Sequence, residues 1–266
     1  MGHPYLSLPA SAFWRRAISE TSPLELKEIY RPKFTLDKKT RIVAAGSCFA
    51  QHIGRQFKQR GYNFVDAEPP PPMLPRENWR QFGYDTYSAR YGNVYSARQL
   101  LQLVEGAMGH FTPHESVWIN DGRFYDPFRP SVEPDGFTSE EEVRCMRKAH
   151  LAAVAAMLAD ADVFVFTFGL TEAWTNTEDG AVYPTCPGTI AGTFDSSRHK
   201  FVNFTVSDVV ADTRKFIALA RTFNPRMRFL FTVSPVPLTA TASGWHVLPA
   251  TVTQSRFFER FVASFP

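Results

Sequence analysis

Short apolar runs alternate along the chain with stretches in which apolar residues recur every three or four positions. The runs over 41–46, 162–169 and 228–235 are rich in Val, Phe and Ala and have polar residues on either side. Continuous apolar runs of this length predict strands that are buried on both faces of a sheet. The stretch 62–68 predicts one more strand near the first.

The amphipathic stretches between these runs predict helices. After Cys48, the apolar residues Phe49, Ile53 and Phe57 recur every four positions, and Gly61 is suited to end the helix. Further helices are predicted to begin at Ser96, at Thr138 or Ser139, and near residue 207, each with a side chain that can cap the first turn.

Three segments carry no such periodicity. Residues up to about 39 mix proline, aromatic and charged residues and predict an extended arm with a short helix over 12–20. Residues 110–137 predict a loop or hairpin insertion, and residues 171–203 predict a long polar loop.

Buried strands that alternate with helices predict a parallel sheet covered by helices on both faces. The expected fold class is therefore α/β, a three-layer α/β/α sandwich with a mostly parallel, flavodoxin-like sheet. We expect an N-terminal arm over 1–40, one α/β domain over 41–248, and a tail over 249–266 that does not resemble the rest.

Composition and charge narrow the function classes. The chain has 266 residues, a formal net charge of +3 and scattered basic residues, which argues against nucleic acid as a partner. No stretch approaches the roughly 20 apolar residues of a membrane span. The three cysteines have no metal-type or disulfide-type spacing, so we expect reduced thiols and a cytoplasmic location.

Ligands of parallel sheets bind beyond the carboxyl ends of the strands. The residues that follow the predicted strands are Ser47 and Cys48, the segment Gly169-Leu170-Thr171-Glu172, and Ser234. These positions are the first candidates for a functional site.

Ser47 has two interpretations. It can be a helix N-cap, a position that favours serine because the hydroxyl accepts a hydrogen bond from a free N–H group. It can also be a nucleophile, because the N–H groups and the dipole of a helix start stabilise an oxyanion. Cys48, with His52 one helical turn later, is the alternative nucleophile, although we expect His52 to be a surface or packed residue.

Four ordered motifs, "AAGSCFAQHIGRQF", "RYGNVYSARQLLQL", "FTFGLTEAW" and "LFTVSPVPLTAT", resemble those of the GSCFA family. That family resembles the SGNH (GDSL-like) hydrolases, which are three-layer α/β esterases. The resemblance implies that Ser47 is the nucleophile, although it stands second in Gly46-Ser47-Cys48, where the usual motif has serine third.

The resemblance also implies an oxyanion hole. Gly92 would supply a backbone N–H with Asn93 beside it, and Gly169 and Thr171 fall where SGNH enzymes carry Gly-x-Asn-Asp, with Glu172 last. Thr171 would then replace an amide donor with a hydroxyl. If this is right, the Ser47 hydroxyl faces the same cleft as Gly92 and Thr171.

SGNH-like proteins complete their site with Asp-x-x-His near the C-terminus, and no such pair follows Ser234. Back-translation of Thr253–Arg260, shifted by one nucleotide, can encode Tyr-Ser-Lys-Ser-Val-Leu-Arg-Ala, which resembles the expected continuation. The missing pair reflects either real divergence or lost sequence, and we favour lost sequence. We expect that a frameshift replaced everything after about Leu248 or Pro249, so that the last strand-helix unit is missing, a sheet edge is exposed and the tail packs poorly.

Two functions follow from these residues. The first is a serine ester hydrolase or O-acyltransferase that acts on a small acylated substrate, with acetyl groups of carbohydrates as the superfamily analogy, and with impaired activity. The family resemblance implies neither a metal nor an organic cofactor. The second is a non-catalytic protein of the same fold that binds a glycan or a partner. Aromatic residues that can stack on sugar rings are Trp118, Tyr125, Trp174 and Trp245.

Overall fold

Three of the predicted strands form a parallel sheet. In the computed structural model, which describes residues 2–27 and 29–263, β1 (Ile42–Gly46) and β8 (Arg228–Val233) flank β4 (Val163–Phe168). Ile42 pairs with Val163, and Val163 pairs with Arg228, so the three strands start level and run in the same direction. Every residue of β1 and β4 is buried, as the apolar runs predicted.

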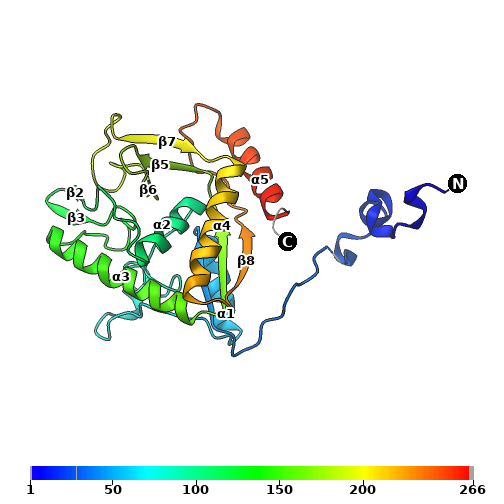
Figure 1. Cartoon of the computed structure of the whole chain (residues 1–266), viewed down its shortest axis with the longest axis horizontal. Helices are drawn as coiled ribbons and strands as arrows, with labels where there is room; N and C mark the ends of the chain where they lie inside the picture. Colours follow the sequence, from blue (N-terminus) through cyan, green and yellow to red (C-terminus); the bar gives the residue numbers. More distant parts are fainter. Residues whose placement is uncertain (1, 28, 264–266) are drawn as a thin grey trace. The chain divides into compact units, whose positions relative to one another are not determined.

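The helices flank this sheet, and their first turns show why they begin where they do. The helices are α1 (Ala50–Gln59), α2 (Ala97–Ala107), α3 (Glu140–Asp160), α4 (Val206–Phe223) and α5 (Val247–Ala263). Ser96, Ser139 and Thr205 cap α2, α3 and α4 through their side-chain oxygens. Helix α1 packs against β1, α2 packs against α3 and α4, and α5 packs against β8 (Figure 1).

This arrangement confirms the expected α/β sandwich. One strand was predicted in excess, because residues 62–68 make only a single parallel bridge, between Phe64 and Ile42. That bridge still places the segment beside β1, on the side away from β4. The order of segments is thus the flavodoxin-like one, in which the chain reverses its direction of growth between β1 and β4.

The predicted long loop over 171–203 is wrong, because it contains a second sheet. The strands β5 (Glu172–Asn176), β6 (Val182–Tyr183) and β7 (His199–Asn203) are antiparallel, with β5 in the centre. In Figure 1 the arrow of β8 points toward the side on which β5 and β7 lie. The predicted insertion over 110–137 contains a hairpin of β2 (Trp118–Asn120) and β3 (Arg123–Tyr125).

The C-terminal helix α5 was not expected. Phe258 is buried in the main core, and its ring lies 5.5 Å from that of Phe168. The Gln254 side chain donates to the carbonyl of Gly169 at 2.7 Å and accepts from the N–H of Thr171 at 3.3 Å. The expectation of a poorly packed tail is therefore wrong for Gln254 and Phe258, whereas β8 does lie at the edge of its sheet and is only half-buried.

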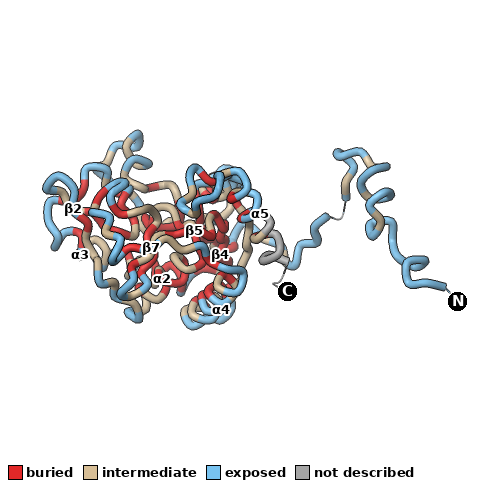
Figure 2. Tube along the Cα trace, turned by 90° about the horizontal axis from the view of Figure 1, so that it is seen from above, coloured by how far each residue is buried: buried red, intermediate tan, exposed pale blue. Residues whose placement is uncertain are grey.

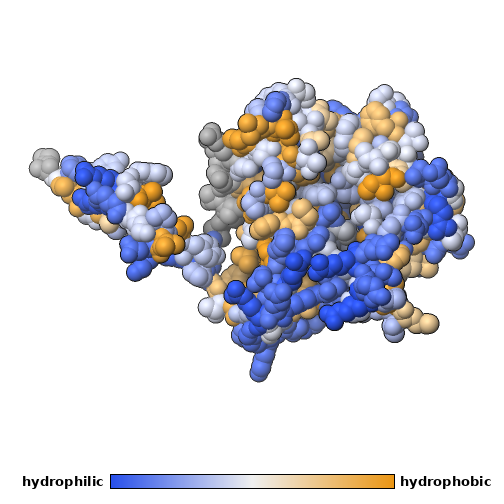
Figure 3. Space-filling view, turned by 180° about the vertical axis from the view of Figure 1, so that it is seen from behind, coloured by the Kyte–Doolittle hydropathy of each residue, from blue (hydrophilic) through white to orange (hydrophobic). Residues whose placement is uncertain are grey.

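The chain divides into two units, residues 1–37 and 38–266. The first unit contains short helical turns, at Pro4–Ser7, Ala10–Ala12, Arg15–Ser19 and Pro23–Glu25, and none of its described residues is buried. In the second unit the buried residues concentrate around α2, β4 and β5 (Figure 2). Figure 3 shows a largely hydrophilic lower half on one face of this unit, with hydrophobic patches above it.

No described helix has both the length and the hydrophobicity that a membrane-spanning segment needs.

Candidate functional site

The carboxyl ends of the three parallel strands open into one cavity of about 460 Å³. Ser47 and Cys48 follow β1, Gly169 and Leu170 follow β4, and Ser234 and the segment after it follow β8. The structure thus brings together six of the candidate positions on the wall of this cavity, namely Ser47, Cys48, Gly169, Leu170, Glu172 and Ser234. Its position between β1 and β4 is where flavodoxin-like sheets bind their ligands.

Ser47 does not cap the helix that follows it. Helix α1 begins at Ala50 after Phe49, and the turn is closed by the carbonyl of Ser47, which accepts from the N–H of Ala50 at 2.8 Å. Ser47 is 3% exposed, and its buried Oγ has no hydrogen-bond partner among the described residues. A buried hydroxyl without a partner costs free energy, so a purely structural role does not explain this serine.

Two glycines allow Ser47 to sit where it does. Gly46 has a φ of +147°, and a Cβ there would lie 2.7 Å from the carbonyl oxygen of Thr167. A Cβ on Gly169 would lie 2.7 Å from the Cβ of Ser47. The side chain of Ser47 therefore packs directly on the backbone of Gly169, and any larger residue at 169 must displace it.

Tyr87 connects the Ser47 backbone to the segment that carries Gly92 and Asn93. Its hydroxyl lies 3.1 Å from the carbonyl oxygen of Ser47 and 2.5 Å from Oδ1 of Asn93, and its single hydrogen can go to either. Burial raises the pKa of Tyr87, so the phenol stays protonated. The N–H of Val94 also donates to the carbonyl of Gly46, at 3.0 Å. These bonds hold the segment against the end of β1.

The remaining candidates do not line the cavity of Ser47. Gly92, with a φ of +66°, and Asn93 line a neighbouring hollow next to Tyr87. Thr171 is buried and lines a smaller hollow beside α5, together with Gln254 and Trp245. Thr171 and Gly92 therefore line other hollows than Ser47 does, whereas we expected the three residues to face one cleft.

The second sheet forms the wall of the cavity that faces away from the parallel strands. Trp174 on β5 pairs with Tyr183 on β6 and with Phe201 on β7, and all three line the cavity. Residues paired in this way lie on the same face of a sheet, so they form one aromatic row. Glu172 lies two residues before Trp174 on β5 and thus on the same face.

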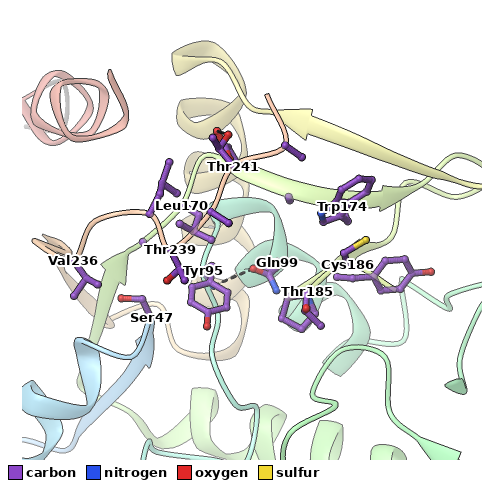
Figure 4. A pocket seen from close by; sticks show the side chains of 18 of the residues that line it. Ser47, Tyr95, Gln99, Leu170, Trp174, Thr185, Cys186, Val236, Thr239 and Thr241 are labelled. Carbon is purple, nitrogen blue, oxygen red and sulfur yellow. Dashed lines mark hydrogen bonds between the residues drawn. The ribbon is translucent and has the colours of Figure 1, made fainter. Parts of the chain in front are cut away.

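The beginning of α2 completes the wall. The Gln99 side chain accepts from the N–H groups of Tyr95 and Ser96 at 3.0 and 3.2 Å, and Ser96 Oγ accepts from the N–H of Gln99. This capping box fixes Tyr95 at the edge of the cavity. Burial raises the pKa of Tyr95, the nearby thiol of Cys48 adds to the rise, and a hydrogen bond from Asn93 opposes it. Figure 4 shows Ser47 and Trp174 at opposite ends of the cavity, with Tyr95 and Gln99 between them.

The sequence pointed to one of these wall residues, Trp174, and missed Tyr95, Tyr183 and Phe201. That Tyr183 and Phe201 lie beside Trp174 is evident only when the register of β5, β6 and β7 is known. The other aromatic candidates do not line the cavity, since Trp118 and Tyr125 lie in a buried cluster that also contains Tyr183, and Trp245 is largely exposed.

Among the described residues, the cavity wall has no histidine and no cluster of side chains that could bind a metal. None of the histidines in the described part of the chain lines the cavity, and His52 is exposed beside the ring of Phe49. No group of three or more His, Cys, Asp or Glu side chains among the described residues could hold a metal ion. The cavity wall carries two thiols and one carboxylate, from Cys48, Cys186 and Glu172, and several hydroxyl groups, among them that of Ser47.

The sequence model of the GSCFA family matches residues 41–255, which contain all strands β1 to β8 of the described part of the chain. The chain belongs to the GSCFA family. The match covers both walls of the cavity and extends into α5 as far as Ser255, so the GSCFA region includes Gln254 and its contacts with Gly169 and Thr171. Searches of curated proteins and of solved structures found no match to the chain.

Proposed function

We propose that this GSCFA protein is a serine-dependent ester hydrolase or acyltransferase, with Ser47 as its nucleophile. The proposal rests on the Oγ of Ser47, a residue on the wall of the main cavity. This oxygen is buried and has no hydrogen-bond partner among the described residues. A hydroxyl that neither caps a helix nor bonds to a neighbour is kept at a cost to stability, which is typical of functional groups.

The backbone around Ser47 supports the stabilisation of an oxyanion. The N–H of Cys48 has no acceptor among the described residues, and it precedes the first turn of α1. The N–H of Ser47 donates to the carbonyl of Thr167 over a long 3.4 Å. Free N–H groups at a helix start favour a developing negative charge, so the Cys48 N–H is the first donor that we assign to the oxyanion.

In the reaction, Ser47 Oγ forms a bond to the acyl carbon and the bond from this carbon to the alcohol oxygen breaks. The serine proton leaves and the departing alcohol gains one, through water in the cavity. Because no histidine among the described residues lines the cavity, the base assistance that an imidazole supplies, about 10²- to 10⁴-fold, is not available from this wall. We therefore expect slow turnover, with acyl or phosphonyl transfer to Ser47 as the step that can be observed.

The substrate must reach an oxygen that is covered in this conformation. The segment 234–242 lines the cavity and contains no helix or strand. Its bonds to the rest of the fold include those of the Leu238 N–H to Thr251 and of Thr241 to Glu172. We assign to this segment the movement that exposes Ser47.

Labelling with a fluorophosphonate probe tests the proposal, because this strongly electrophilic reagent depends less on a general base than an ester does. We expect the wild type and Cys48→Ala to be labelled and Ser47→Ala to remain unlabelled, with parallel loss of p-nitrophenyl acetate hydrolysis in Ser47→Ala. Equal labelling of the wild type and Ser47→Ala would refute the proposal. Loss of labelling in Cys48→Ala alone would assign the nucleophile to Cys48.

A non-catalytic binding protein is the second candidate. The observation in its favour is that no histidine of the described residues lines the cavity of Ser47. A wild type that binds small ligands in the cavity but shows neither labelling nor hydrolysis would establish this function instead.

A further inference from the structure

The cavity of Ser47 carries a single charge. Of the residues that line it, Glu172 is the only one with an ionisable acidic or basic side chain of the Asp, Glu, Lys, Arg or His type. Glu172 is 9% exposed and forms no ion pair with any described cation. Other buried carboxylates have one, as Asp212 does with Arg98 at 2.8 Å and Asp126 with Arg129 at 2.8 Å.

Glu172 is held in place by a neutral neighbour. Oε1 accepts from the hydroxyl of Thr241 at 2.8 Å, and this hydroxyl also lies 2.8 Å from that of Ser243. No hydrogen bond to Oε2 is formed within the described part of the chain. Burial of a carboxylate without a cation is costly, so a positive group from outside the chain would complete this site.

The aromatic row lies next to this carboxylate. Trp174, Tyr183 and Phe201 share the face of the second sheet on which Glu172 also lies. Trp174 and Phe201 are half-buried, with ring centroids 5.8 Å apart and planes at 66°. Two inclined aromatic faces beside one carboxylate attract an alkylated ammonium group through cation–π and charge interactions.

We propose that this cavity binds organic cations, and that the preferred ester carries an alkylated ammonium group that lies between Glu172 and the aromatic row. Ser47 and Trp174 lie at opposite ends of the cavity, so such an ester would place its charge at one end and its carbonyl at the other (Figure 4). The volume of about 460 Å³ is in the range of small-ligand sites. The ester part of this inference rests on the proposed function, whereas the binding of the cation does not.

The test compares choline with 3,3-dimethylbutan-1-ol, a neutral molecule of the same shape, in calorimetric titrations of the full chain. We expect the wild type to bind choline about 5- to 30-fold more tightly than the neutral alcohol, the factor that corresponds to one cation–π and charge site. Glu172→Gln keeps an acceptor for Thr241 and should remove most of this preference. Glu141→Gln, which removes the same charge from the exposed surface of α3, should leave it intact.

Equal affinity for the two alcohols in the wild type would overturn the inference, and this outcome does not depend on the folding of any variant. An unchanged preference in Glu172→Gln would overturn it as well. Choline binding should persist in Ser47→Ala. If choline is preferred but acetylcholine is not hydrolysed and no probe labels Ser47, the cation site stands and the proposed hydrolase function fails.

Discussion

Replacement of Ser47 by alanine should stabilise the protein. The Oγ of Ser47 is buried and has no hydrogen-bond partner in the described part of the chain, so the wild type bears the desolvation cost of a hydroxyl without compensation. This cost is about 1–3 kcal/mol for a buried polar group, and alanine removes the oxygen with little loss of packing. We expect the free energy of unfolding to rise by about 1 kcal/mol, and Tm by about 2–4 °C in a domain of this size.

Ser88 offers a matched control. It is 0% exposed, and its Oγ accepts from the backbone N–H of Ala44 in β1 at 2.9 Å. Ser88→Ala should therefore lower the free energy of unfolding by about 1–3 kcal/mol, because it leaves that N–H unpaired. Urea unfolding and differential scanning calorimetry measure both variants. If Ser47→Ala destabilises the protein as Ser88→Ala does, the Ser47 hydroxyl has a structural role and our reasoning is refuted.

Three further variants test other parts of the structure. Gly169→Ala places a Cβ 2.7 Å from that of Ser47. We expect this variant to lose fluorophosphonate labelling and its free energy of unfolding in urea to fall by about 1–3 kcal/mol. Normal labelling would contradict the close packing of Ser47 on Gly169. Gln254→Ala leaves the buried carbonyl of Gly169 and the N–H of Thr171 without their partner. The free energy of unfolding should therefore fall by about 1–3 kcal/mol. An unchanged urea midpoint would show that α5 does not support the segment from Gly169 to Thr171. Burial lowers the pKa of His150 to about 4, with Arg129 adding to the shift and Glu68 opposing it, so the unfolded chain binds more protons between pH 4 and 6.5. Stability should fall by on the order of 3 kcal/mol as the pH drops through this window, and His150→Gln should remove most of that slope; the same slope in both proteins would show that His150 is not its source.

The apolar runs and helix caps predicted most of the fold. Val163–Phe168 is a buried strand because its run leaves no polar face, and α3 begins after Ser139 because that side chain caps the first turn. The second sheet was missed because its strands are short and partly polar, and because β5 pairs with β7, whose residues lie more than 20 positions away. Such pairing depends on contacts that no local pattern reports.

The candidate site was predictable where it depends on topology alone. Ser47 and Gly169 follow neighbouring parallel strands, and the ends of such strands meet. The placement of Thr171 was not predictable, because its N–H is bound by Gln254 of α5, a helix that was not expected from the sequence. The charge of Glu172 beside Trp174 follows from the two-residue period of β5, which could be recognised only when that segment is known to be a strand.

The most direct measurement of the central claim is the mass of the peptide that carries the fluorophosphonate adduct. The protein would be labelled in its folded state, digested with trypsin and sequenced by tandem mass spectrometry. Our account predicts that the adduct lies on the hydroxyl of Ser47, and that heat-unfolded protein is not labelled. An adduct on any other residue, or equal labelling of folded and unfolded protein, would contradict it.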